Sequence, residues 1–143
     1  FICFGADVIV GFPGESDPEF EETYEFIRSL PFSYLHVFTF SPRAGTRAAL
    51  FDHQIDIPVA KERCHRLRAL SVQKAIEFRK QFIDRYLDVI ILNTQDPGTG
   101  KTIGLSDNYL KIQIDTPSPP AGSLATVSVT EVNGLQMTGR IRG

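Results

Sequence analysis

The stretch Gly5-Ala6-Asp7-Val8-Ile9-Val10-Gly11-Phe12-Pro13-Gly14-Glu15 decides how the first part of the chain folds. Its Val-Ile-Val run at 8–10 is β-branched and puts apolar groups on both faces, as in a parallel strand covered by helices. Gly11 and Gly14 bracket a turn, because glycine adopts positive φ and lets a backbone or ligand approach closely. If the strand is parallel to its neighbours, this turn lies at their carboxyl ends, where α/β sheets and barrels place ligands.

A helix and a second strand are expected after this turn. Ser16 and Glu19 have capping-box spacing, and Pro18 suits a first helical turn. Pro31 ends the helix, whose expected inward stripe is Phe20, Tyr24 (or Thr23), Ile27 and Leu30. Residues 34–40 are typical of a second buried strand. This order predicts a right-handed βαβ unit with the turns at 12–15 and 41–47 on the same side.

The pattern changes after residue 57. Pro58 opens a long helix over about 59–83, and one face of it carries Cys64, Leu67, Ser71, Ala75, Phe78 and Phe82. Short strand-like runs come next at 86–92, 101–105, 109–114, 124–132 and 135–141, separated by turn residues. Asn133-Gly134 indicates a hairpin, and the Pro-rich patch at 116–123 is expected to be a loop. Together they predict a small closed antiparallel barrel in the style of the OB-fold.

Charge is unevenly distributed along the 143 residues, whose formal net charge is −2. Residues 1–57 carry a net −6, residues 58–83 a net +5, and residues 84–143 a net −1. Attraction to nucleic acid is therefore expected to centre on the long helix. Its basic side chains form either a solvated surface or a phosphate-facing edge, and they are Lys61, Arg63, Arg66, Arg68, Lys74, Arg79 and Lys80.

Cysteine and histidine spacing argues against a metal centre within the chain. Cys3 and Cys64 lie far apart in no motif, which favours reduced buried thiols of a cytosolic protein over a disulfide or metal pair. Without CxxC or CxxxCxxC, the chain lacks the usual cysteine spacing for a four-iron cluster. His36, His53 and His65 have no ligand spacing either, and His36 is expected to be structural. No apolar run approaches the ~18 residues of a membrane span.

One tempting nucleotide motif fails. Gly98-Thr99-Gly100-Lys101-Thr102 is similar to the end of a P-loop, but that motif requires glycine where Gln95 stands and a helix afterwards. The residues after Thr102 are strand-like, so phosphate binding is not expected at this segment.

Two segments carry a family resemblance. The first stretch is similar to the "DxIVGFPGE" strand and turn of the methylthiotransferase family of radical S-adenosylmethionine enzymes. Residues 35–46, LHVFTFSPRAGT, resemble the "LHVFxYSPRxGT" segment of the branch that acts on threonylcarbamoyladenosine in tRNA, with Ala44 where proline is common. The run of strands after the long helix resembles a TRAM domain.

The resemblance implies an α/β fold: the last βα units of a radical S-adenosylmethionine partial TIM-like barrel (1–57), a connecting helix (58–83) and a TRAM-like barrel (84–143). It implies a cytoplasmic tRNA methylthiotransferase that adds a methylthio group to N6-threonylcarbamoyladenosine beside the anticodon. S-adenosylmethionine and two 4Fe-4S clusters are the implied cofactors, and the tRNA anticodon stem-loop the implied partner. Because the chain opens inside a strand and holds no cluster cysteines, N-terminal domains are expected to be missing and the fragment inactive alone.

The resemblance also implies site residues. The last barrel strands hold the adenosine of the cofactor, which places it against Val10, Gly11, Phe12, Phe40 and Ser41. Arg43 and Arg47 come after the second strand and suit a carboxylate or phosphate, or else form an exposed turn paired with the acidic first helix. The candidates for RNA contact in the barrel are Lys101, Tyr109, Lys111, Arg140 and Arg142. No residue here is expected to be catalytic or to bind metal.

Other hypotheses stay open at this point. The near-neutral barrel is compatible with the sister branch, which modifies a ribosomal protein, and with a non-catalytic module that binds RNA or protein. Glu15 either accepts a hydrogen bond from a ligand, acts as a base, or serves the following helix terminus.

Overall fold

A computed structural model describes residues 1–115 and 117–142. The chain forms two compact units, one made of residues 4–74 and the other of residues 1–3 with residues 75 onward. Helix α2 (Ile57–Lys80) supplies residues to both units. Each unit has an apolar core of its own.

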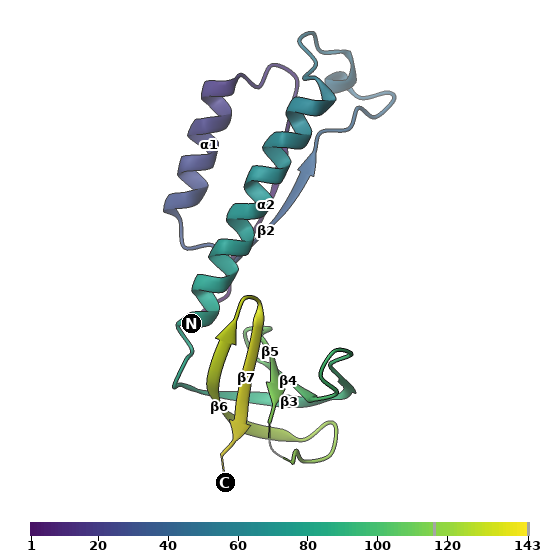
Figure 1. Ribbon diagram of the computed structural model, residues 1–143. Coiled ribbons are helices and arrows are strands. Elements are labelled where there is room, and N and C mark those ends of the chain that lie inside the picture. The colour runs from purple at the N-terminus through teal and green to yellow at the C-terminus, as the bar shows by residue number, and fades with distance from the viewer. Residues whose placement is uncertain (116, 143) are drawn as a thin grey trace. The chain divides into compact units, whose positions relative to one another are not determined.

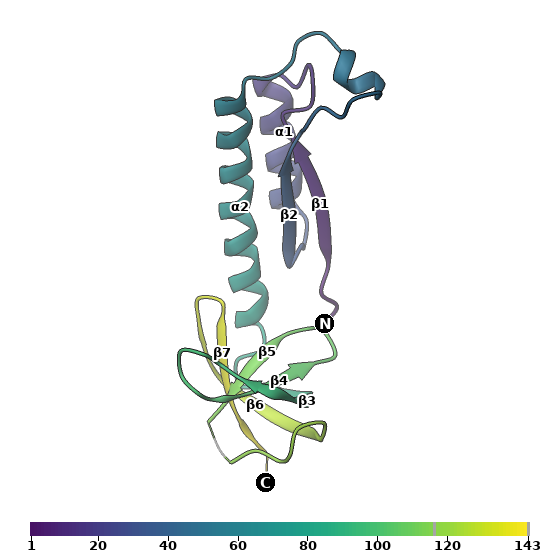
Figure 2. The same cartoon turned by 90° about the vertical axis from the view of Figure 1, so that its right-hand side faces the viewer.

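The first unit is built on a parallel strand pair. Strands β1 (Gly5–Val10) and β2 (Tyr34–Thr39) run side by side in one direction, with Gly5 opposite Tyr34 and Val10 opposite Thr39 (Figure 2). Helix α1 (Asp17–Ser29) connects them, and the short 3-10 helix η1 (Arg47–Leu50) lies after β2. The predicted βαβ unit is confirmed. Among the described residues its sheet has two strands, so the larger barrel implied by the resemblance stays a prediction.

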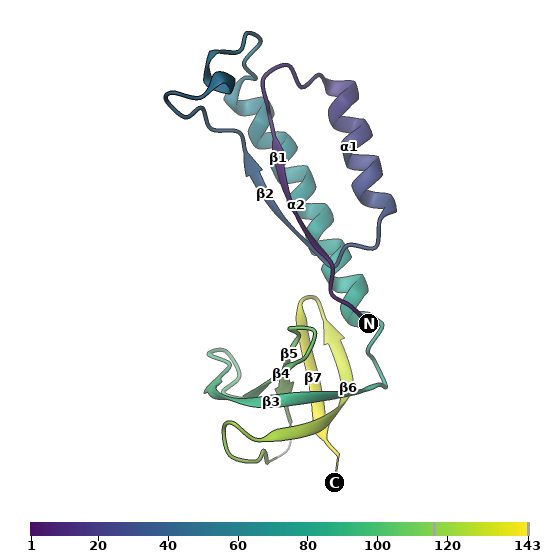
Figure 3. The same ribbon diagram turned by 180° about the vertical axis from the view of Figure 1, so that it is seen from behind.

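Local chemistry explains where α1 begins. Ser16 is the N-cap and makes the predicted capping box with Glu19, which satisfies backbone donors that have no partner inside the helix. Helices α1 and α2 lie alongside each other next to the strand pair (Figure 3). They share one apolar core with the strands, formed by Val10, Phe20, Ile27, Leu35, Val37, Cys64, Leu67 and Leu70.

The opposite face of the strand pair is not covered by these helices. Ile9 on β1 and Phe38 on β2 are directly opposite each other and are 58% and 52% exposed. His36 lies on the same face beside Tyr34, with ring centroids 5.2 Å apart. His36 is exposed, because side chains alternate along a strand and residue 36 falls on the open side, and its expected structural role stays a prediction.

Several basic side chains of α2 hold the first unit together. The Lys74 ammonium is buried and donates hydrogen bonds to the carbonyls of Arg28 and Leu30, at 2.8 and 2.6 Å. Arg68 donates to the carbonyl of Val37 at 3.0 Å. For Lys74, both a solvated surface and a phosphate-facing edge are wrong hypotheses, because its ammonium is buried against carbonyl acceptors at the end of α1. Arg68 stays exposed, as expected for a solvated helix surface.

The second unit is a closed five-stranded barrel (Figure 1). Its strands are β3 (Tyr86–Gln95), β4 (Thr102–Ser106), β5 (Lys111–Ile114), β6 (Leu124–Asn133) and β7 (Gln136–Ile141), in the spatial order β3-β4-β5-β7-β6. The predicted runs are confirmed as strands. The prediction of a wholly antiparallel barrel is wrong in one place, because β5 and β7 pair in parallel to close it.

Close backbone approach shapes the barrel interior. A Cβ added to Gly139 would lie 2.5 Å from a methyl of Val127 and 2.6 Å from the carbonyl oxygen of Ser128. The predicted hairpin at Asn133-Gly134 is confirmed, and Gly134 has φ +58°. Residues 117–123 form an irregular connection before β6, and Thr116 of the predicted loop lies outside the described residues. No helix in the described part of the chain has the length and apolar content of a membrane span.

Candidate functional site

The turn after β1 is fixed by the carboxylate of Glu15. Glu15 Oε2 accepts hydrogen bonds from the backbone N–H of Gly11 at 2.6 Å and from Arg63 Nη1 at 2.7 Å. Gly11 and Gly14 both have positive φ, at 74° and 88°, as predicted for glycines that bracket a turn. A Cβ on Gly11 would also lie 2.6 Å from the Cβ of Ala60 on α2, so the turn approaches the helix closely.

Arg63 is the buried centre of this arrangement. Its side chain is 6% exposed and also donates to the Glu15 carbonyl at 2.9 Å and to Asp17 Oδ1 at 2.6 Å. Burial lowers the pKa of Arg63, but the hydrogen bonds to the Asp17 and Glu15 carboxylates outweigh burial and raise the pKa above its ordinary value. The charged pair therefore ties the β1 turn to α2, and the Glu15 carboxylate is already occupied by protein donors.

The turn after β2 lies beside the first turn. The N–H of Phe40 donates to the Val10 carbonyl at 2.8 Å, which continues the strand pairing beyond β2. The Phe40 ring packs edge to face against Phe12 with centroids 5.1 Å apart, and Phe12 also contacts Phe51 at 6.1 Å. The expectation that both turns come together at the carboxyl edge of the strands is confirmed.

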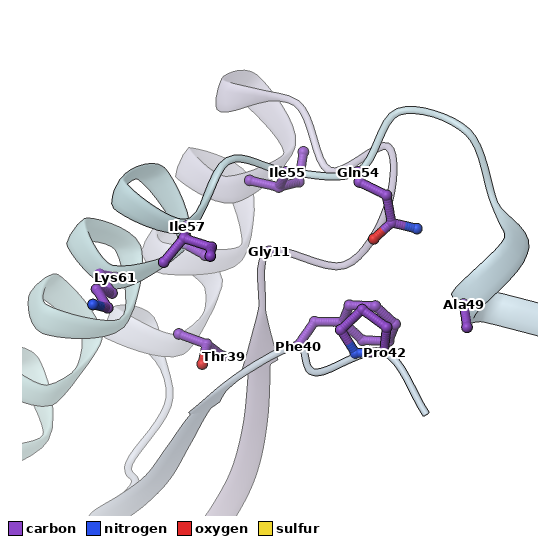
Figure 4. Close-up of a pocket in the computed structure, with 10 residues that line it drawn as sticks. Gly11, Thr39, Phe40, Pro42, Ala49, Gln54, Ile55, Ile57 and Lys61 are labelled. Atoms are coloured by element: carbon purple, nitrogen blue, oxygen red, sulfur yellow. The ribbon is translucent and has the colours of Figure 1, made fainter. Parts of the chain in front are cut away.

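These turns enclose one side of a cavity of about 410 Å³. Figure 4 shows its lining side chains, which come from the ends of the strands and the two turns, the 3-10 helix η1, the segment before α2 and the first turns of α2. The wall is mainly apolar, and Thr39, Gln54 and Lys61 contribute polar groups. This size and mixture are typical of small-molecule sites, which bind through apolar walls and a few polar contacts.

The structure separates the five predicted cofactor residues. Gly11 and Phe40 line the cavity. The side chain of Val10 is fully buried in the helix-facing core, Phe12 supports Phe40 from outside the lining, and Ser41 is exposed. Whether any of them binds the cofactor stays a prediction.

Sequence reasoning did not assign four residues of this region to the candidate cofactor site: Thr39, Gln54, Lys61 and Arg63. Gln54 lies in an irregular loop without a pattern, and Arg63 is one of many cations on α2. The positions of Arg63 and Glu15, 48 residues apart, become neighbours only after the βαβ unit folds. Arg43 and Arg47 are exposed, and neither pairs with the acidic α1 helix in the described part of the chain.

The barrel places its predicted RNA-binding residues on several strands and turns. Lys101 forms an ion pair with Asp115, while Tyr109 lies in the β4–β5 turn and is 81% exposed. Lys111 on β5, Arg140 on β7 and Arg142 just after β7 are exposed. Their contact with RNA stays a prediction.

The strand predicted after residues 98–102, where a P-loop would have a helix, is confirmed. Asp96 Oδ1 accepts hydrogen bonds from the N–H groups of Gly98 and Thr99, at 3.0 and 2.9 Å, and from the Thr99 hydroxyl at 3.0 Å. The segment is therefore a turn closed by its own aspartate, and strand β4 comes after it instead of a helix.

The described residues do not offer an iron–sulfur site. They contain no group of three or more His, Cys, Asp or Glu side chains that could hold a metal, and both cysteines are free thiols. The clusters implied by the resemblance do not fit this part of the protein, so none of its residues is assigned to them.

Comparison with known proteins finds homologues over most of the chain. No family model matches the chain. It is 41% identical over 128 residues to the threonylcarbamoyladenosine tRNA methylthiotransferase MtaB of Bacillus subtilis (strain 168), covering 87% of this chain and 28% of that protein. The chain is homologous to the C-terminal part of tRNA methylthiotransferases. This agrees with the family resemblance found in the sequence.

Two further relatives are tRNA-2-methylthio-N(6)-dimethylallyladenosine synthases. That of Bartonella bacilliformis (strain ATCC 35685 / KC583 / Herrer 020/F12,63) is 34% identical over 138 residues, covering 96% of this chain and 30% of that protein. That of Zymomonas mobilis subsp. mobilis (strain ATCC 31821 / ZM4 / CP4) is 35% identical over 139 residues, covering 97% of this chain and 31% of that protein. The chain thus spans under a third of the length of these methylthiotransferases.

Proposed function

We propose that the chain is part of a tRNA methylthiotransferase that acts on N6-threonylcarbamoyladenosine. The observation that supports this substrate is the 41% identity to a relative named for threonylcarbamoyladenosine, against 34% and 35% for two relatives named for dimethylallyladenosine. The part of the longer protein that this chain does not span would hold the iron–sulfur clusters, since no described residues fit them.

The proposed role of the first unit is to hold the adenosine of S-adenosylmethionine. The cavity wall offers the Phe40 ring and the glycine backbone at Gly11, while Thr39 and Gln54 supply polar atoms. When bound, S-adenosylmethionine supplies the methyl group and the radical initiator, because the cofactor carries the hard chemistry. Phe40 packs on Phe12, and Glu15 with Arg63 holds the Gly11 turn, so this chain contributes a preorganised wall.

The proposed role of the second unit is to bind the substrate tRNA through its anticodon stem-loop. Arg140, Arg142 and Lys111 are exposed cations on the barrel and suit phosphate contact. Lys101 is the weaker candidate, because its ammonium already pairs with Asp115.

The deciding experiment uses cells that lack the full-length parent gene. Their bulk tRNA is digested, and nucleosides are measured by mass spectrometry. We expect methylthio-threonylcarbamoyladenosine to disappear and threonylcarbamoyladenosine without the methylthio group to accumulate. Unchanged nucleosides would refute the tRNA substrate, and a simultaneous loss of methylthio modification on a ribosomal protein would establish the sister activity instead.

Complementation then tests the cofactor wall. The full-length gene carrying Phe40→Ala should restore the methylthio nucleoside poorly, because the aromatic wall of the cavity is lost. Leu50→Ala is the matched control, since Leu50 is an exposed apolar residue of the neighbouring 3-10 helix and does not line the cavity. Equal restoration by both variants, at equal protein levels, would exclude Phe40 from the cofactor site.

A further inference from the structure

Three strands of the barrel place an aromatic ring, a hydroxyl and a guanidinium in one row. Tyr86 on β3 is directly opposite Ser128 on β6, and Ser128 is directly opposite Arg140 on β7. Their neighbours Val127, Val129 and Gly139 are buried in the barrel interior. Because side chains alternate along strands, the three residues of the row point to the outer surface.

A second arginine completes this surface. The N–H of Arg142 donates to the Thr126 carbonyl at 2.9 Å, which extends β7 beyond its last residue along β6. The Arg142 guanidinium lies 5.0 Å from the centroid of the Tyr86 ring, within cation–π distance, and the Tyr86 residue stays 57% exposed. We call Tyr86, Ser128, Arg140 and Arg142 the Tyr86 strip.

Two of the acidic side chains in the barrel have partners of their own. Asp88, two residues along β3, accepts a hydrogen bond from the Thr126 hydroxyl at 2.7 Å, and Asp115 at the end of β5 pairs with Lys101. Within residues 1–115 and 117–142, the side chain of Arg140 makes no hydrogen bond or ion pair. Its positive charge is therefore available to an external anion.

We propose that the Tyr86 strip binds single-stranded RNA, with an unpaired base stacked on Tyr86 and neighbouring phosphates bound by Arg140 and Arg142. An aromatic ring offers a face for any unpaired base, and arginine matches phosphate geometry. Paired bases of an RNA duplex are already stacked and offer no free face to a side chain. This inference rests on the proposed tRNA substrate and deepens it by assigning a base-stacking residue that sequence analysis did not select.

The test measures binding of the 143-residue chain to two fluorescent probes by anisotropy. One probe is a single-stranded ribo-oligonucleotide, and the other has the same sugar–phosphate backbone without bases. Tyr86→Ala should weaken binding to the first probe by about 5- to 150-fold, the range for loss of one stacked base, and leave binding to the abasic probe unchanged. Tyr86→Phe should restore most of the affinity, because the ring face is kept.

The arginines should behave differently from Tyr86. Arg140→Gln should weaken binding to both probes and reduce the slope of log affinity against log salt by about 0.7, the value for one phosphate contact on a single strand. Leu124→Ala is the control, because Leu124 is an exposed apolar residue that starts β6 in the same barrel. Circular dichroism and a thermal melt establish that each variant is folded.

Each outcome decides a separate question. If wild type and Tyr86→Ala bind the single-stranded probe with equal affinity, the proposal for the Tyr86 strip is overturned. The same holds if Tyr86→Ala loses as much affinity for the abasic probe as for the single-stranded probe. Neither result would contradict the proposed tRNA substrate. A loss with Tyr109→Ala in place of Tyr86→Ala would move the stacking site to the β4–β5 turn and overturn the proposal. No binding of wild type to either probe at low salt would overturn RNA binding by the barrel altogether. The nucleoside measurement on the deletion strain tests the proposed function independently.

Discussion

The carboxylate of Glu15 binds the guanidinium of Arg63 across 48 residues of sequence, with Oε2 and Nη1 2.7 Å apart. The same oxygen accepts the N–H of Gly11 at 2.6 Å. One carboxylate atom thus joins the turn after β1 to the helix that covers the strands. Because Gly11 lines the cavity, the ion pair stabilises the wall of the candidate site.

Replacing Arg63 with alanine should destabilise the first unit strongly. The Glu15 carboxylate would lose its buried partner, and breaking a buried pair by removing one side costs about 3–5 kcal/mol. Arg63→Lys should recover part of this loss, since an ammonium carries the charge but lacks the fork that reaches both Glu15 and Asp17. Urea unfolding monitored by circular dichroism gives the free energy of unfolding.

Arg28→Ala is the control for Arg63. Arg28 pairs with Glu25 on the exposed side of α1, where an ion pair contributes little to stability. Similar unfolding midpoints for Arg63→Ala and Arg28→Ala would contradict a stabilising role of the Glu15–Arg63 pair.

Gly11→Ala should destabilise the chain more than Gly14→Ala. Both glycines have positive φ, so each alanine carries the cost of a left-handed conformation, about 1–2 kcal/mol. At Gly11 the new methyl group would also lie 2.6 Å from the Cβ of Ala60, whereas at Gly14 it meets nothing within 4 Å. The difference between the two urea midpoints therefore isolates the close approach of the turn to α2, and equal midpoints would refute it.

Lys74→Met should lower the free energy of unfolding by about 1–3 kcal/mol, the cost of leaving buried polar groups without a partner. The Lys74 ammonium is the donor to the carbonyls of Arg28 and Leu30 at the end of α1, and methionine keeps much of the length of the side chain without the donor. Lys80→Met, an exposed lysine at the end of the same helix, should change stability little. An equal effect of both substitutions in urea unfolding would show that the buried hydrogen bonds contribute nothing.

Acid should remove the contribution of Asp96 to barrel stability. Hydrogen bonds from the Thr99 backbone, the Thr99 hydroxyl and the Gly98 backbone favour the carboxylate and lower the pKa of Asp96 below its ordinary value of 3.8. A folded-state pKa below the unfolded value stabilises the fold above the unfolded pKa, and the contribution is lost as pH falls through the folded pKa. Near neutral pH the melting temperature of wild type should therefore exceed that of Asp96→Asn. This difference in melting temperature should disappear as the pH falls below 3.8.

Thermal melts of both proteins between about pH 6 and about pH 3 check this dependence. Asp107→Asn serves as the comparison, because Asp107 lies in the next barrel turn and accepts no hydrogen bond from the described residues. If the difference in melting temperature between wild type and Asp96→Asn does not change with pH, the charge of Asp96 does not stabilise the barrel.

Local patterns in the sequence predicted most of the secondary structure. The Ser16–Glu19 capping box, the turn at Asn133-Gly134 and the helical spacing of Cys64 and Leu67 each depend on residues a few positions apart. Such interactions are encoded by neighbouring residues and need no knowledge of tertiary contacts. The family segments at 5–15 and 35–46 are also local, and their resemblance agrees with the relatives found for the chain.

Such local patterns did not predict the parallel pairing of β5 and β7. The strands were predicted, but which edges meet when five strands close into a barrel depends on packing of their inward side chains. Gly139 illustrates this. A side chain at this position would clash with Val127 and Ser128 on a neighbouring strand, so the requirement for glycine is set by that strand. Periodicity gives the face of each strand but not its neighbour in a closed sheet.

The sequence by itself determined the βαβ unit, the long helix, the barrel strands and the family resemblance, because periodicity, caps, turns and motifs act over short distances. Tertiary structure alone decided the partners of the charged groups that interact over long sequence distances. It buried Arg63 against Glu15, placed Lys74 under the end of α1, and brought Tyr86 into one row with Arg140. A charged or aromatic side chain in a sequence has many possible neighbours, and only the folded backbone fixes which of them lie within contact distance.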